Sequence, residues 1–415
     1  MQLSLDEAVQ MALEKNRSVV IGLVRIDEAD ARVQRAHSSR LPKVRFLGGY
    51  VRLSEVEPFS FTTPFAPMPI TIAPTILNNF RTRLTLTQPI FTGLRLSNLS
   101  KSAKYGSDAA REESHHVNSE VVFNVTRAYW NLYRAIETEV VISETIKQIT
   151  EHLTDVQNFA GVGMATANAV LKVRVQLSEV QLKHIEAKNR IRLAILHLNN
   201  LLTLPLETKI NPIERPTGAV AAIAELPVLI SRALEQRSDL RSTEFHVKML
   251  DANLSATRGG WFPQVYLQAN YDYARPNPRV QPIKDDWRDT WDVAVTVEFT
   301  LWDWFNTAGE ASEARAKLEQ ARLMSDQARD LVKLDVSESY FKLLEEEDKV
   351  EVAREGQGQA RENYRITQYK FRENLVSNTE LLDAEVALLQ AKLNQTHAEI
   401  DYRIAVASLA RSIGG

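Results

Sequence analysis

The sequence predicts an α+β membrane protein built from two similar halves, each with long helices and a few strands. One observation is the placement of proline: all 15 prolines lie between Pro42 and Pro89 or between Pro205 and Pro282. Because proline costs about 3 kcal/mol inside a helix, the two proline-free tracts predict long helices. The other observation is a repeated motif, which occurs as RLPKVRFLGGY at 40–50 and as WFPQVYLQANY at 261–271. Such a repeat predicts an internal structural duplication.

The proline-free tracts carry the heptad pattern of closely packed helices. Apolar and small residues alternate at spacings of three and four from Val170 to Leu201, and again from Leu381 to Leu409. A helix from about Phe305 to Tyr369 would be roughly 100 Å long at 1.5 Å per residue. That length exceeds an ordinary globular domain, so we expect long helical rods packed along their seams.

The proline zones contain segments in which apolar and polar residues alternate, as strands with two different faces do. The clearest is WDVAVTVEFTLW at 291–302, and 80–87 and 264–273 follow the same rule. Any one of these strands could belong to a half-buried soluble sheet. Together they favour membrane-spanning strands with a lipid side and a water side, and with aromatic residues near their ends. The aromatic residues that fit such ends are Tyr50, Tyr271, Tyr273, Trp287 and Trp291.

The duplication sets the expected domain boundaries. Repeat 1 is predicted over residues 1–211 and repeat 2 over 212–415, with matching residues 221 apart before the strands and 211 apart after them. The shift lies in the loop between the paired strands, which is longer in repeat 1, from Glu57 to Pro74. The expected elements of repeat 1 are helices within 3–39, strands at about 42–56 and 76–91, and long helices at about 97–158 and 166–203. Those of repeat 2 are helices within 224–258, strands at about 263–275 and 287–302, and long helices at about 305–370 and 378–411.

Two strands per half give four strands per chain, which cannot close a barrel. Because lipid tolerates no open strand edge, several chains must share one barrel. Three chains would supply twelve strands and twelve helical rods, and a ring of identical chains closes naturally. The residues alone favour three copies without deriving that number.

Composition excludes several other classes of protein. Lys and Arg number 50 against 53 Asp and Glu, a net charge of −3 that gives no reason to expect a nucleic-acid partner. Cysteine is absent, which excludes disulfides, thiolate metal sites and thiol nucleophiles. Catalytic and nucleotide-binding motifs are not found, so we expect neither an enzyme nor a cofactor. His115 and His116 are expected on an exposed helix face and not in a metal site.

Membrane helices and targeting segments are not expected either. No stretch approaches the roughly 18 consecutive apolar residues of a membrane helix. The segment Met1–Glu7 has neither the basic nor the apolar region of a signal peptide, which is therefore either absent or removed.

With these residues in view, the chain resembles the TolC family of outer membrane factors, also called outer membrane efflux proteins. Both repeat openings carry the likeness, LSLDEAVQMALEKN at 3–16 and LPVLISRALEQRSDL at 226–240. So do the strand starts PKVRFLGGY and PQVYLQANY. The helix-turn segments VGMATANAVLKVRVQLSEVQL at 162–182 and YKFRENLVSNTELLDAEVALLQAKLN at 369–394 complete it.

The resemblance implies a fold, a location and partners. It implies a homotrimer with a 12-stranded outer-membrane β-barrel, four strands per chain, continued by a long α-helical barrel in the periplasm. The implied function is a passive exit duct of a tripartite efflux pump that carries small molecules out of the periplasm. The implied partners are outer membrane lipid, a periplasmic adaptor (membrane fusion protein) and an inner-membrane pump. A type I secretion conduit for polypeptides stays open as an alternative, and a soluble coiled-coil scaffold is a more distant one.

The resemblance also implies a constriction at the periplasmic end, from acidic residues early in the last helix. The matching positions are Glu380 and Asp383, whose spacing of three places them on one helix face. Threefold repetition would gather six carboxylates at a narrow mouth, attracting cations. A second interpretation is local, because Ser377 and Glu380 have the spacing of a capping box.

The two helix-turn tips are implied to contact the adaptor. The matching residues are Gly163, Met164, Ala165 and Thr166 in the first tip and Asn374, Leu375 and Ser377 in the second. A plain helix–helix turn is the alternative. The sequence departs from the family where Asn374 replaces a frequent glycine, Val376 an arginine and Ala169 an aspartate. An arginine latch and a second acidic ring are therefore not expected.

Two groups of charged residues complete the expectations. Arg81, Arg83, Asp292 and Glu298 lie on the polar faces of the predicted strands and are candidate charges of a barrel lumen. The same residues could instead line the solvated face of a soluble sheet. The acidic run from Glu345 to Asp348 is expected to be a solvated helix face.

Overall fold

The structure is a computed structural model that describes residues 1–57, 59–61, 64–65, 68, 70–73, 75–216 and 224–415. Two units are compact by themselves: one comprises Met1–Ile26, Ala110–Thr243 and Ser325–Gly415, and the other comprises Asp27–Ala109 and Glu244–Met324. Each unit takes segments from both predicted repeats. The division into residues 1–211 and 212–415 therefore describes the chain's duplication and stays a prediction.

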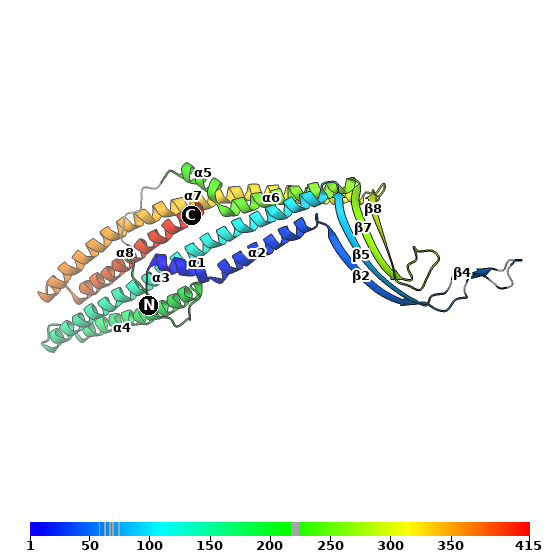
Figure 1. Ribbon diagram of the computed structural model, residues 1–415. Coiled ribbons are helices and arrows are strands. Elements are labelled where there is room, and N and C mark those ends of the chain that lie inside the picture. The colour runs from blue at the N-terminus through cyan, green and yellow to red at the C-terminus, as the bar shows by residue number, and fades with distance from the viewer. Residues whose placement is uncertain (58, 62–63, 66–67, 69, 74, 217–223) are drawn as a thin grey trace. The chain divides into compact units, whose positions relative to one another are not determined.

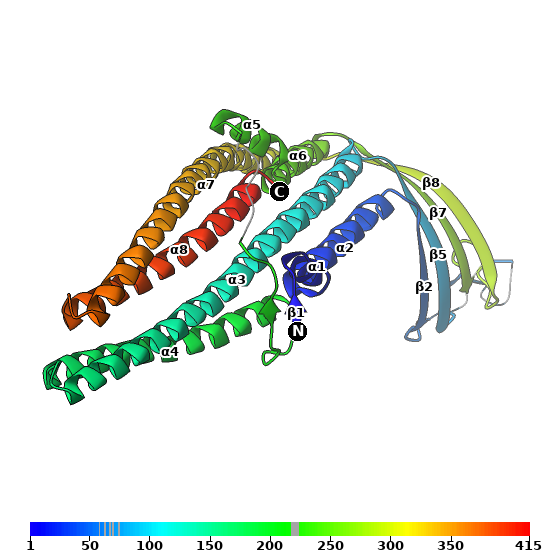
Figure 2. The same ribbon diagram turned by 90° about the vertical axis from the view of Figure 1, so that its left-hand side faces the viewer.

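The second unit contains a four-stranded antiparallel sheet in the order β2-β5-β7-β8, seen as four curved strands side by side in Figures 1 and 2. The strands are β2 (Lys43–Arg52), β5 (Asn78–Phe91), β7 (Gln264–Arg275) and β8 (Arg288–Glu298). Strand β5 pairs with β7, so the two halves of the chain meet in the middle of the sheet. Strands β2 and β8 form its two edges.

One face of this sheet is apolar and is exposed. The register places Phe46 opposite Leu84, Leu84 opposite Tyr271, and Tyr271 opposite Trp291, all on the same face. Trp291 is 70% exposed, and its strand neighbours Val293, Val295 and Val297 are exposed as well. A soluble half-buried sheet would hide such a face, because burying apolar area contributes roughly 25 cal/mol per Å². The exposed apolar face therefore favours the membrane interpretation of these strands.

Short strands complete the sheet structure. Strand β1 (Gln2–Leu3) pairs in parallel with β6 (Asn211–Pro212). Strands β3 (Phe59–Phe61) and β4 (Ile70–Ala73) pair within the predicted long loop Glu57–Pro74, part of which lies outside the described residues.

The long helices occupy the proline-free tracts. They are α3 (Arg95–Gly161) and α4 (Ala167–Leu201), and α7 (Asn306–Arg372) and α8 (Asn378–Ser412). Helices α3 and α7 have 67 residues each, about 100 Å at 1.5 Å per residue. Among the described helices, none combines the length and apolarity that crossing a membrane requires.

Shorter helices precede the strands in each half. They are α1 (Leu5–Lys15) and α2 (Arg17–Ser38), then α5 (Leu226–Gln236) and α6 (Ser238–Arg258), followed by the 3-10 turn η1 (Gly259–Trp261). The break between the two helices is made alike in both halves. Asn16 donates through Nδ2 to the carbonyl of Leu201, and Arg237 donates through Nη1 to the carbonyl of Ser412. These pairs are related by the sequence offsets, so the same contact is built twice.

Candidate functional site

The first tip, residues 162–166, is a tight turn between α3 and α4. The amide of Met164 donates to the carbonyl of Phe159 at 2.8 Å, and that of Gly163 donates to Ala160 at 3.1 Å. This is the Schellman arrangement, which needs a left-handed residue after the helix. Gly163 supplies it with φ of +79°. Thr166 then begins α4 by accepting a hydrogen bond from the amide of Ala169.

The second tip, residues 373–377, repeats this geometry between α7 and α8. The amide of Leu375 donates to Lys370 at 2.8 Å and that of Asn374 to Phe371 at 2.9 Å. Asn374 takes the left-handed position with φ of +59°. Asparagine tolerates this conformation better than other residues with a Cβ. The departure from the family's frequent glycine therefore leaves the turn type unchanged.

The first tip exposes Val162 and Met164, the second exposes Leu375, and each partly buries the next residue. Leu375 is 71% exposed and Met164 is also exposed. Ala165 and Val376, the following residues, pack against the cluster that contains Val173, Phe371 and Leu381. The two tips thus share one core, while Met164 and Leu375 stay exposed.

Glu380 and Asp383 lie in the first turns of α8, both exposed. Glu380 does make the capping box: its Oε1 accepts from the Ser377 hydroxyl at 2.9 Å and from the Ser377 amide at 3.2 Å. The local interpretation therefore holds for Glu380. It does not exclude the constriction role, because the capped carboxylate stays exposed at the tip.

The structure adds a buried pair near the tips that sequence reasoning missed. His152 of α3 and Glu385 of α8 lie with Nδ1 and Oε2 3.1 Å apart, and their side chains are only 3% and 1% exposed. The ring of His152 also contacts Phe371 edge-on. Burial, together with the charges of Glu385 and Glu151, raises the pKa of Tyr364 to about 12 beside them. Glu385 occupies a buried face that also holds Leu381 and Leu388, which heptad spacing alone does not reveal.

The polar face of the sheet brings Arg81 and Arg83 to one carboxylate that was not singled out from the sequence. Asp272 Oδ1 lies 2.7 Å from Arg83 Nε and 3.1 Å from Arg81 Nε, and its Oδ2 accepts from Arg83 Nη2 at 2.8 Å. Strand β5 carries the two arginines and strand β7 the aspartate. The register that pairs Arg83 with Asp272 could have identified it.

Asp292 belongs to a second polar chain on the same face. Its Oδ2 accepts from Asn270 Nδ2 at 2.9 Å, and its Oδ1 accepts from Arg279 Nη1 at 3.1 Å. Glu298 lies at the last position of β8, opposite Gln264, and is exposed. The structure therefore groups Arg81, Arg83 and Asp292 in one charged band and leaves Glu298 at its border.

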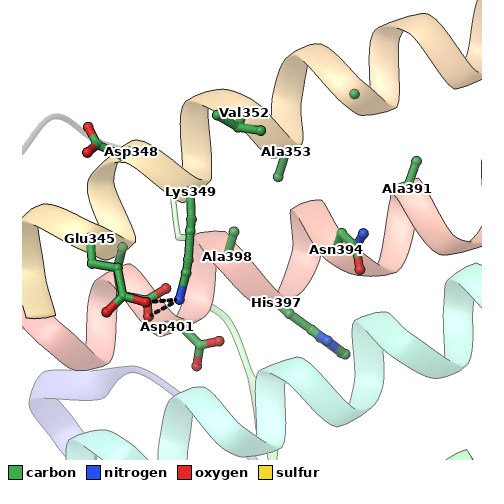
Figure 3. Close-up of a pocket in the computed structure, with 12 residues that line it drawn as sticks. Glu345, Asp348, Lys349, Val352, Ala353, Ala391, Asn394, His397, Ala398 and Asp401 are labelled. Carbon is green, nitrogen blue, oxygen red and sulfur yellow. Dashed lines mark hydrogen bonds and ion pairs between the residues drawn. The ribbon is translucent and has the colours of Figure 1, made fainter.

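A groove of about 690 Å³ lies between α7 and α8, as Figure 3 shows. Lys349 reaches across its wall to Glu345 at 2.5 Å and Glu346 at 3.1 Å. The side chain of Glu346 is buried and also pairs with Lys342. The expectation of a fully solvated acidic face is therefore wrong for Glu346. Within the part of the chain that the structure describes, no group of three His, Asp or Glu side chains could hold a metal ion.

The family model for outer membrane efflux proteins matches residues 8–203 and 229–415. The chain belongs to the outer membrane efflux protein family. The resemblance drawn from the sequence is therefore confirmed, as is the outer membrane location at the level of the family. The family is one of efflux channels and is not an enzyme class.

Relatives of known name share about a fifth of their residues with the chain. The probable outer membrane lipoprotein SilC of Salmonella typhimurium is 22% identical over 97% of this chain and 84% of its own length. The cation efflux system protein CusC of Escherichia coli O157:H7 is 20% identical over 98% of this chain and 85% of its own. The solvent efflux pump outer membrane protein SrpC of Pseudomonas putida is 22% identical over 77% and 68%.

Solved outer-membrane channels have the same fold. OprN superposes with a TM-score of 0.83 at 18% identity, over 99% of this chain and 90% of OprN. VceC of Vibrio cholerae also superposes with a TM-score of 0.83, at 13% identity, over 99% of this chain and 96% of VceC. At these identities the likeness is one of fold alone, which is that of TolC-family channels.

Proposed function

We propose that three copies of this chain form a passive exit duct of a tripartite efflux pump. The observation that carries the proposal is the exposed apolar face of an open four-stranded sheet. A lone chain with such a sheet would expose both an apolar face and two unpaired edges. Lipid on the apolar face and further copies at the edges would satisfy both.

The sheet edges support joining of copies. Among the described strands, β2 pairs only with β5 and β8 only with β7. Pairing of β8 with β2 of the next copy would continue the alternation of antiparallel strands. Three copies would give twelve strands and a closed barrel, with Arg83, Asp272 and Asp292 facing the water inside.

The helices support the same arrangement. Besides its buried seam, α4 carries a second stripe at heptad spacing that is exposed. Helix α7 carries another. The exposed residues of these stripes are Leu171, Val175, Leu182 and Ile185 on α4, and Leu331, Leu334, Phe341 and Val352 on α7. Two apolar stripes on one helix fit a helix packed between neighbours on both sides.

The partners follow from the tips and from the family. Val162, Met164 and Leu375 are apolar side chains exposed at the two turns, a suitable contact for an adaptor's helical tip. The adaptor would connect the duct to an inner-membrane pump that supplies the energy. Small-molecule cargo is favoured over polypeptides, because the relatives' names include cation and solvent efflux.

Glu380 and Asp383 would line the periplasmic mouth. Six carboxylates from three copies would concentrate cations at a narrow passage and repel anions. Planar-bilayer conductance of the purified protein tests this. We expect stepwise channels with cation selectivity that weakens in the double variant Glu380→Gln/Asp383→Asn.

A matched control removes two exposed carboxylates far from the tip in sequence, in Glu351→Gln/Glu355→Gln. That variant should keep the selectivity of the natural protein. Folded protein that never conducts would contradict the duct and favour the coiled-coil scaffold. Channels with unchanged selectivity in both variants would remove only the role of Glu380 and Asp383.

A further inference from the structure

The turns that lead from the sheet into the long helices are built alike in the two halves. Gly93 and Leu94 have φ of +58° and +64° between β5 and α3, and Trp304 and Phe305 have +54° and +66° between β8 and α7. Each pair is therefore left-handed at both residues. The pairs lie 211 residues apart, which is the offset of the repeats in this part of the sequence.

The hydrogen bonds of the two turns also correspond. The amide of Arg95 donates to the carbonyl of Thr92 at 3.0 Å, and that of Asn306 donates to Asp303 at 3.1 Å. The side chain of Asp303 accepts from the amide of Thr307, as the hydroxyl of Thr92 accepts from Leu96. The two turns therefore share the same backbone conformation and the same pattern of hydrogen bonds at corresponding residues.

The first turn is filled by a neighbouring segment of its own chain. A Cβ added to Gly93 would lie 2.4 Å from the carbonyl oxygen of Gly259, and one added to Gly259 would lie 2.8 Å from Cβ of Arg95. Gly93 and Gly259 are both buried. The turn after β5 thus packs tightly on the joint that leads from α6 into β7.

The second turn and the other joint are left without such a contact. Trp304, which corresponds to Gly93, is 83% exposed. Ser38, which corresponds to Gly259 at the offset of 221, is exposed at the joint that leads from α2 into β2. Leu41 of this joint is exposed too. Within the described residues, the Gly93–Gly259 contact therefore has no counterpart between the second turn and the α2–β2 joint. The second turn instead lies beside the α6–β7 joint, where a Cβ added to Gly260 would lie 3.2 Å from the Thr307 side chain.

We propose that the turn after β8 docks on the Ser38–Leu41 joint of a second copy, with Trp304 as its central contact. A head-to-tail contact of this kind uses two different surfaces of the chain and closes into a ring. This contact would form beside the proposed pairing of β8 with β2 of the next copy. In the same way, the Gly93–Gly259 contact lies beside the pairing of β5 with β7 within the chain. The inference rests on the proposed multi-copy duct and adds the residues of one interface.

The choice of tryptophan supports this occupant over lipid. A bulky residue in the left-handed region strains the backbone, so a chain that keeps one there requires a compensating contact. Leu94 stays 64% exposed although the first turn is filled, so its counterpart Phe305 is the side chain expected to remain at the lipid boundary. Trp304 corresponds instead to the buried position. Gly93 lets the backbone of the first turn approach Gly259 directly. The indole of Trp304 is large enough to reach Ser38 of a second copy across a wider distance.

Cysteine cross-linking tests the contact without background, because the 415 residues of this sequence contain no cysteine. In the filled contact, Arg95 is the residue whose Cβ meets Gly259, and its counterpart in the second turn is Asn306. The test variant is therefore Ser38→Cys/Asn306→Cys, which retains Trp304. We expect a short thiol–thiol cross-linker to join copies of the purified channel into covalent dimers and trimers.

Two controls make the result specific. In the control Ser38→Cys/Phe305→Cys, the second cysteine replaces Phe305, whose side chain we expect to face away from the joint. This variant should cross-link several-fold less than Ser38→Cys/Asn306→Cys. Trp304→Gly introduces the residue that the first turn has at this position, Gly93. It should lower the temperature at which the copies dissociate, although it removes the backbone strain of a tryptophan with positive φ. Equal cross-linking in the two pairs, or no effect of Trp304→Gly, would overturn the proposed contact. Conducting channels without any cross-link would overturn it too and leave the duct standing.

Discussion

His152 Nδ1 lies 3.1 Å from Glu385 Oε2, and this pair joins α3 to α8 inside the cluster beneath both tips. His152 Nε2 and Glu385 Oε1 have no hydrogen-bond partner within the described structure. Each side chain is therefore satisfied by the other alone. Buried polar groups held by a single contact are costly to separate.

We expect Glu385→Leu to destabilise the protein by roughly 1–3 kcal/mol, because it leaves the buried His152 unpaired. The double variant His152→Leu/Glu385→Leu should recover much of that loss, since an apolar pair of similar size replaces both partners. Thermal unfolding followed by circular dichroism measures both variants in the same detergent. Additive losses in the double variant would show that the two side chains do not depend on each other.

Gly163 and Asn374 occupy equivalent left-handed positions in the two tips, so each can be replaced by the residue that the other tip uses. Asn374→Gly should stabilise the second tip by up to about 1 kcal/mol, because glycine adopts φ of +59° without the penalty of a Cβ. Gly163→Asn should destabilise the first tip by a similar amount, and Gly163→Val by more. Thermal unfolding compares the three. A loss of stability in Asn374→Gly would mean that the asparagine side chain makes a contact of its own.

Arg237 holds the break between α5 and α6 to the end of α8. Its guanidinium lies 2.6 Å from carboxylate oxygens of both Asp239 and Asp335 and 3.1 Å from the carbonyl of Ser412. Arg237→Ala should cost roughly 1–3 kcal/mol, because the half-buried carboxylates of Asp239 and Asp335 lose this partner, although Asp335 keeps its pair with Arg411. Arg237→Lys should recover only part of that lost stability, since an ammonium group cannot form the paired hydrogen bonds that a planar guanidinium makes to a carboxylate. Arg365→Ala, which breaks an exposed pair with Glu362, should change the unfolding temperature little.

The charged band of the sheet can be tested by conductance. Asp272→Asn removes the carboxylate that both Arg81 and Arg83 bind, leaving their positive charges unbalanced. If this face lines the water-filled lumen, the channel should shift measurably toward anions. Lys317→Gln, on an exposed part of α7, changes charge away from the sheet and should leave selectivity unaltered. An unchanged reversal potential in Asp272→Asn would place the band outside the conducting path.

Much of the architecture could be read from local rules. Proline placement indicated the long helices, because a proline inside them would break the hydrogen-bond ladder. Alternation indicated a wet and a dry face on the strands, and the register now shows Phe46, Leu84 and Trp291 on one face. Both signals depend on the backbone and on neighbours close in sequence.

What escaped prediction depends on residues far apart in sequence. Glu385 looks like an ordinary helix-surface acid until packing brings His152 of α3 to it. Glu346 pairs with Lys342 and Lys349 one turn away on its own helix, and only the packing of that helix buries it. Asp272 could be paired with Arg83 only once the strand register was known. The left-handed conformation of Trp304 is also unexpected, because tryptophan disfavours it and nothing in the local sequence signals it.

His397 of α8 supplies a dependence of stability on pH. Burial first, and then the positive charge of Arg134, lower its pKa from the ordinary value, while Asp401 opposes them. The folded protein therefore prefers the neutral ring, whereas the unfolded chain takes up a proton near pH 6.5. The stability that depends on the neutral ring is full above that pH and declines as the pH falls toward the lowered pKa. Between pH 7 and pH 5 the unfolding temperature of His397→Gln should fall less than that of the natural protein. His115→Gln, at an exposed position on α3, should fall as much as the natural protein does. An equal fall in His397→Gln would assign the acid sensitivity to another group.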